Sequence, residues 1–239
     1  MSRGKFDEIM ALSTKHDWDI ATHAWFRYNR ITADIAHRHL FPAYVGAAVF
    51  AALSPNSDYI GNLRDTNRLL EAVKLRKGLA DFNVSTYESN KIKGWRIAKG
   101  EDPLELIVAN KTRNFFLNVT NPSNPVPVTC DGHIFNAWGG TRIKLSSGGI
   151  HIYHNKYHEV AEAIREIARE HGVLPNVIQG VIWFTYKRIH QIRISSQMEF
   201  WQPEYYVIDR SFRIEACLQP TPPTNQTVFA SLARAEAAA

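Results

Sequence analysis

The chain has 239 residues and a mass of 27.2 kDa, a length typical of one large domain or of a two-lobed helical unit. Hydrophobic residues make up 45% and charged residues 21%, and the 13 Gly and 11 Pro are scattered, which excludes a fibrous or wholly disordered chain. Two cysteines are too few for a disulfide framework or for a four-cysteine zinc or iron–sulfur site. The net charge of +5 is compatible with a polyanionic partner such as nucleic acid.

The sequence contains no candidate membrane anchor. Its longest apolar run, residues 45–53, is nine residues long, about half of the roughly 20 residues that a membrane-spanning helix needs. The first eight residues include acidic side chains and lack an apolar core, unlike a signal peptide. We therefore expect no membrane partner and a cytoplasmic location, associated with the nucleoid in a bacterial cell.

Hydrophobic periodicity predicts an all-α protein. Apolar residues recur at steps of three and four, and the expected helices are residues 17–40, 43–53, about 58–77, 87–99, 103–108, 111–119, 132–138, 155–171 and 176–190. Residues 43–53 are apolar all round, which is typical of a helix buried in the middle of a domain. Ser57 or Asp58 can cap the helix that follows.

The pattern changes at two places along the chain. Residues 139–149 contain two Gly pairs around a basic segment and predict a loop or small hairpin. After residue 195 the helical pattern weakens, and residues 205–208 and 212–217 are compatible with short strands. We therefore expect a helical domain, residues 1–195, and a partly irregular C-terminal extension, residues 196–239.

Two stretches, residues 111–118 and 126–135, resemble the catalytic core of the helix-hairpin-helix DNA glycosylases. In the branch that includes endonuclease III and 8-oxoguanine glycosylase, a Lys opens the second helix of the hairpin and an Asp caps the helix after a proline-containing linker. Lys111 and Asp131, twenty residues apart, match these two positions. Residues 48–70, broken at Ser54-Pro55-Asn56-Ser57, are similar to the family's buried helix and to the loop that enters the duplex. The match is divergent, of a phage or mobile-element type, and its hairpin and catalytic segment span about residues 87–138.

The resemblance implies a two-lobed fold with a central cleft, in which the hairpin and Asp131 lie on one wall and Asn56 on the other. It also implies a DNA N-glycosylase that flips a damaged or modified base out of the duplex. Cleaving the N-glycosidic bond builds positive charge on the sugar, which the Asp131 carboxylate would stabilise. The Lys111 amine would attack C1′, and a Schiff base formed there would permit AP-lyase activity.

The remaining candidate residues follow from the same resemblance and from helical spacing. The expected DNA contacts are Ser54, Asn56, Asn110, Thr112, Arg113 and His133. Gln179 and Trp183 are four residues apart on one helix face, where an amide and an indole could bind and stack on a base. Purely structural roles stay open for several of the candidates: Lys111 as a solvated lysine, Asp131 as an ordinary N-cap, Asn56 as a turn residue and Trp183 as a core residue.

One departure from the family pattern concerns the hairpin itself. Relatives have two glycines just before the lysine, where this chain has Ile107-Val108-Ala109-Asn110, so its backbone would approach a phosphate less closely. We expect a monomer with no organic cofactor and no iron–sulfur cluster. Whether a monovalent cation binds at the hairpin stays open. Two alternatives also stay open: a base-remodelling (hypermodification) enzyme of the same superfamily, and a non-catalytic helix-hairpin-helix DNA-binding protein.

Overall fold

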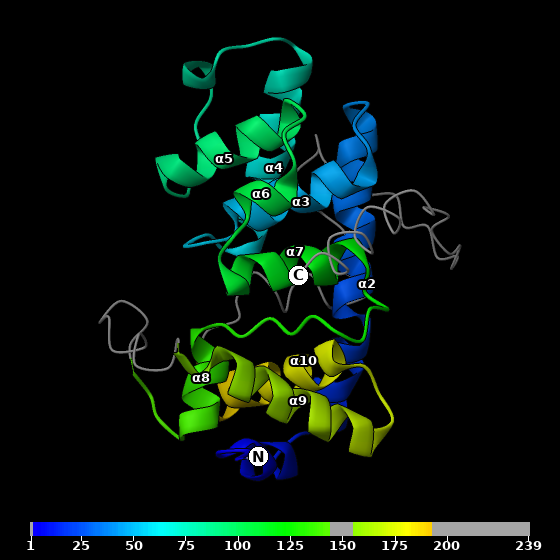
Figure 1. The fold of residues 1–239 in the computed structure, drawn as a ribbon, viewed down its shortest axis with the longest axis vertical. Helices are drawn as coiled ribbons and strands as arrows, with labels where there is room; N and C mark the ends of the chain where they lie inside the picture. The colour runs from blue at the N-terminus through cyan, green and yellow to red at the C-terminus, as the bar shows by residue number, and fades with distance from the viewer. Residues whose placement is uncertain (1, 144–154, 193–239) are drawn as a thin grey trace. The chain divides into compact units, whose positions relative to one another are not determined.

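The computed structural model describes residues 2–143 and 155–192, which belong to the first of two compact units, Met1–Gln197 and Met198–Ala239. These ranges are helical and contain no strand, so the predicted all-α class is confirmed there (Figure 1). The α-helices are α1 (Phe6–Ala11), α2 (Lys15–Arg38), α3 (Ala43–Leu53), α4 (Tyr59–Lys74), α5 (Glu88–Ala98), α6 (Pro103–Leu106), α7 (Asn110–Thr120), α8 (Gly132–Gly139), α9 (Tyr157–His171) and α10 (Pro175–Ile189). The expected strands and most of the expected 139–149 loop lie outside the described residues.

Local sequence signals explain where these helices begin. Asp58 caps α4, because its side chain accepts a hydrogen bond from the Gly61 amide at 2.9 Å. Thr14 and Asp17 form a reciprocal capping box at the start of α2. Helix α1 and the 3-10 turn Leu79–Asp81 are not among the predicted helices, because they are too short to show a helical period.

Helix α3 is the buried centre of the described region, as its uniformly apolar sequence predicted. Every residue from Val45 to Leu53 is buried, and the helix packs against α2, α4, α5 and α7. Gly46 allows the close approach of α2, because a Cβ atom there would lie 2.2 Å from the carbonyl oxygen of Thr32 in α2. The backbones of α2 and α3 therefore touch directly.

Helices α2 and α10 run antiparallel and share three matched contacts. Near the start of α2, Asp17 forms an ion pair at 2.8 Å with Arg188, near the end of α10. In the middle, a Cβ on Gly180 would lie 2.9 Å from the Cβ of Ala21. Further along α2, the indole N–H of Trp25 donates to the backbone carbonyl of Asn176 at 3.0 Å. These three contacts fix the rotation of α10 about its own axis relative to α2.

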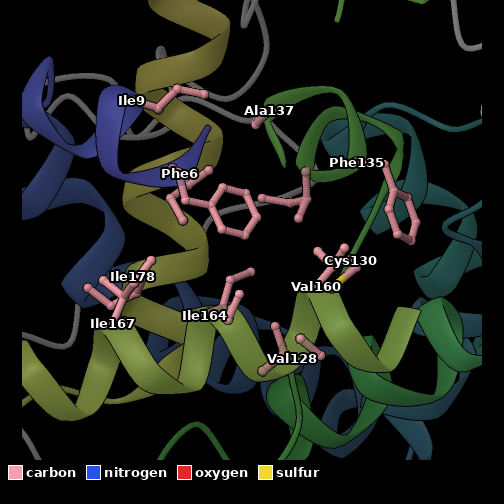
Figure 2. Close-up of a cluster of buried hydrophobic side chains, with 14 of the residues drawn as sticks. Phe6, Ile9, Val128, Cys130, Phe135, Ala137, Val160, Ile164, Ile167 and Ile178 are labelled. Atoms are coloured by element: carbon pink, nitrogen blue, oxygen red, sulfur yellow. The ribbon is translucent and has the colours of Figure 1, made fainter. Parts of the chain in front are cut away.

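A second set of helices encloses its own apolar cluster (Figure 2). Phe6 of α1 is fully buried among side chains of α8, α9 and α10, including Ile134, Ile164 and Ile178. Val128, from the linker before α8, joins the same cluster. The linker is thus held by burial as well as by hydrogen bonds. None of the helices in the described ranges combines the length and apolar composition needed to cross a membrane.

Replacing Gly46 with Ala tests the close approach of α2 and α3. We expect Gly46→Ala to lower the free energy of unfolding by about 1–3 kcal/mol, since the added methyl group must push a backbone carbonyl aside. Gly61→Ala is the matched control, because its Cβ would meet side-chain atoms rather than backbone, Asp58 Oδ2 at 3.3 Å and Ser85 Oγ at 3.4 Å. Equal unfolding free energies of the two variants in urea titrations would contradict the predicted contact.

Candidate functional site

A pocket of about 560 Å³ lies among α2, α3, α4, α7, α8 and α10. Its size is within the range of small-molecule sites. Residues 54, 56–59 and 62 line one part of it, and Lys111, Phe115, Thr129, Asp131 and His133 line another. Helix α10 contributes Gln179, Gly180, Trp183, Phe184 and Lys187. Side chains distant in sequence therefore meet in one cavity.

Aromatic rings from four helices form much of the pocket lining. The ring centroids of Tyr28 and Tyr59 lie 5.1 Å apart, and Phe115 lies 5.6 Å from both Trp25 and Phe50. Burial raises the pKa of Tyr28 and of Tyr59, so both phenols stay neutral. The lining offers apolar, polarisable surfaces of the kind on which a planar group such as a nucleobase stacks.

Asp131 presents a carboxylate whose position is fixed by three N–H donors. As the N-cap of α8, its Oδ1 accepts hydrogen bonds from the amides of His133 and Ile134, both at 3.0 Å. Its Oδ2 accepts a 2.9 Å hydrogen bond from the indole Nε1 of Trp183. A charged acceptor held in this way by a helix N-terminus needs no reorganisation to stabilise a positive charge beside it.

The hydroxyl of Tyr157 holds the linker that ends at Asp131. It donates to the carbonyl of Val128 at 2.8 Å and accepts from the amide of Cys130 and from Nδ2 of Asn114 in α7, both at 3.2 Å. One buried hydroxyl thus joins α9, the linker and α7. It fixes the separation between the helix that starts beside Lys111 and the carboxylate of Asp131.

Lys187 is a buried lysine in the pocket lining. Its side chain is 8% exposed, and its Nζ lies 4.0 Å from the centre of the Trp183 ring. Across the described ranges, no carboxylate lies within ion-pair distance of it. Burial lowers the pKa of Lys187, against the opposing charge of Asp131.

His133 shares this environment. Burial lowers its pKa, Asp131 opposes that shift, and the positive charges of Lys187 and Lys111 add to it. The imidazole is therefore neutral at neutral pH, and its Nδ1 is buried without a hydrogen-bond partner among the described residues. It can donate to or accept from a bound group.

Two amide oxygens in the lining are also buried without a partner among the described residues. Asn62 is 3% exposed and donates from Nδ2 to the carbonyl of Phe50 at 2.9 Å, which leaves its Oδ1 free. Gln179 is 6% exposed, and its Oε1 is likewise unpaired. Burying such acceptors costs free energy unless a ligand or water binds them.

The structure brings most of the predicted site residues together. Ser54, Asn56, Lys111, Asp131, His133, Gln179 and Trp183 all line the pocket. Asn110, Thr112 and Arg113 do not line it, and Thr112 is buried outside the pocket. Asn56 is exposed, and its backbone has the left-handed conformation, with a φ of 58°. It therefore forms part of the turn as well as of the pocket rim.

Sequence reasoning did not place Lys187, Asn62 or the aromatic lining in the site. Lys187 follows Trp183 by four residues and Gln179 by eight, so helical spacing would have indicated it. Nothing comparable in the sequence indicated Asn62 or Phe115, because they reach the pocket only through the packing of α4 and α7.

Nuclear magnetic resonance titration of the His133 ring tests the charge balance of the site. We expect its pKa to lie below the ordinary value in the wild type and to rise in Lys187→Met, because a nearby positive charge is removed. Lys91→Met is the control, since Lys91 is also buried over an aromatic ring but does not line the pocket. An unchanged His133 pKa in Lys187→Met would contradict the conclusion that the charge of Lys187 lowers the pKa of His133.

A second prediction concerns the Tyr157 hydroxyl. Tyr157→Phe removes three hydrogen bonds and leaves a buried backbone amide unpaired, which should cost about 1–3 kcal/mol of unfolding free energy. Thr120→Val is the control, because it removes a hydroxyl that bonds only within its own helix. Chemical denaturation should show the larger loss in Tyr157→Phe, and the reverse order would exclude the role proposed for Tyr157.

No curated protein and no solved structure matches the chain. A family model, described as a family of unknown function (DUF7178), matches residues 8–190. The matched range includes every residue that lines the pocket. Because the match covers more than half of its length, the chain belongs to the DUF7178 family of unknown function.

Proposed function

We propose that the protein is a DNA N-glycosylase that binds a flipped, damaged or modified base in the pocket and cleaves its bond to the sugar. The observation that carries this proposal is the Asp131 carboxylate, held by three N–H donors on the wall of an aromatic pocket. Such a carboxylate stabilises the positive charge that develops on a sugar as the base departs.

The surrounding groups fit the same reaction. The rings of Trp25, Tyr28 and Phe115 offer stacking surfaces for the base, and the unpaired oxygens of Asn62 and Gln179 can accept hydrogen bonds from its edge. A pocket of about 560 Å³ can accommodate a nucleoside-sized ligand. In this proposal the fold has two helical lobes, and Asn56 would fill the space left in the duplex by the extruded base.

Two amines border the pocket and can supply the lysine nucleophile of the reaction. Lys111, the residue expected from the sequence, is exposed in the first turn of α7. Lys187 is buried on α10. Attack by either amine at C1′ leads to a Schiff base, through which lyase activity would follow excision.

Release of free base from a panel of duplexes with damaged and hypermodified bases tests the function. We expect Asp131→Asn to slow single-turnover base release by about 10²–10³-fold, because it removes the charge that stabilises the sugar cation. Asp102→Asn is the matched control, since Asp102 also caps a helix but does not line the pocket. Melting temperatures should show that both variants fold.

The products distinguish this proposal from its alternatives. A base of altered mass in intact DNA, with no abasic site, would favour a base-remodelling enzyme of the same superfamily. DNA binding without base release or base alteration on any substrate would favour a non-catalytic DNA-binding protein. Either result would overturn the glycosylase proposal.

A further inference from the structure

The two amines at the pocket lie in different environments. Lys111 is exposed to solvent in the first turn of α7. Lys187 is 8% exposed and has no ion-pair partner among the described residues. A lysine attacks carbon only as the neutral amine, and burial favours the neutral form over the charged one. The environment of Lys187 is therefore the better suited to nucleophilic chemistry.

Trp183 fixes the Lys187 amine relative to the carboxylate. The Lys187 Nζ lies 4.0 Å from the centre of the indole ring, and the Nε1 of the same indole donates to Asp131 Oδ2 at 2.9 Å. Trp183 and Lys187 are one helical turn apart on α10, and Gly180 seats that helix directly against α2. An amine and a carboxylate thus share one rigid support at the pocket wall.

We propose that Lys187 is the amine that bonds covalently to the substrate sugar, and that Lys111 binds the DNA backbone. This inference rests on the proposed glycosylase function and assigns a nucleophile other than Lys111. The side chain of Lys187 is buried over the Trp183 ring, and this burial disfavours its charged form. Asp131 and the Trp183 ring limit that effect, so the amine stays protonatable.

The covalent step needs only the amine, the nucleotide and one water molecule. The lone pair of the neutral Lys187 nitrogen forms a bond to C1′ while the bond from C1′ to the base breaks. The departing base keeps the electron pair of that bond and gains the proton that the lysine nitrogen loses. The nitrogen lone pair then expels O4′, which takes a proton from water and leaves hydroxide, and the product is a protonated Schiff base between Lys187 and C1′.

Borohydride trapping on a duplex with an abasic site tests this assignment without knowledge of the natural base. The reagent reduces the Schiff base to a stable amine, and peptide mapping of the wild-type adduct identifies the lysine directly. We expect the adduct on Lys187. Because this mapping uses the unaltered protein, the result does not depend on the folding of a variant.

Variants that keep the charge but cannot form a Schiff base provide the second arm. We expect Lys187→Arg to reduce trapping by at least about tenfold, while Lys111→Arg, which keeps the charge that would bind the DNA backbone, still yields the adduct at saturating protein. Lys91→Arg is the matched control, a buried lysine 4.8 Å above the Phe82 ring and outside the pocket. Trapping by this control should equal that of the wild type.

The outcomes separate this inference from the proposed function. An adduct on Lys111, or base release by a wild-type protein that forms no adduct, would overturn the role of Lys187 and leave the glycosylase proposal intact. A wild-type protein that binds no DNA, forms no adduct and releases no base would overturn both.

Discussion

The direct contact between α2 and α10 is the constraint on which the site depends. Because residue 180 is glycine, α10 lies against Ala21, and a larger side chain there would force the helices apart. The Asp17–Arg188 ion pair holds one end of this contact. Burial alone would raise the pKa of Asp17, but hydrogen bonds from Arg188 and Thr14 bring it below its ordinary value.

This contact also orients the chemistry. With Gly180 against α2, the helix directs Gln179, Trp183 and Lys187 along the pocket. The contact between α2 and α3 at Gly46 places the ring centroids of Tyr28 and Phe50, both in the pocket lining, 6.0 Å apart. Two glycines in different helices therefore set the positions of the two kinds of surface, polar and aromatic, that a bound base would meet.

Two carboxylates, Asp58 and Asp131, and two lysines, Lys111 and Lys187, line the pocket. The oxygens of Asp131 already accept three hydrogen bonds, and Asp58 accepts one from the Gly61 amide at the start of α4. Burial lowers the pKa of His133, so the imidazole adds no full charge. Burial also lowers the pKa of Lys187, and this is what favours a reactive neutral amine in the proposed mechanism.

The sequence by itself determined the helices and several of their caps, because hydrophobic periodicity and N-cap chemistry are local properties. It predicted the buried helix α3, the cap at Asp58, and a group of site residues from Ser54 to Trp183, most of which line one pocket. Only the tertiary structure decided which amine is buried and which side chains complete the lining. The environment of Lys187 depends on a helix packed through Gly180, and that of Asn62 on the contact of α4 with α3. Burial and electrostatic environment arise from residues far apart in the chain, so no local pattern could report them.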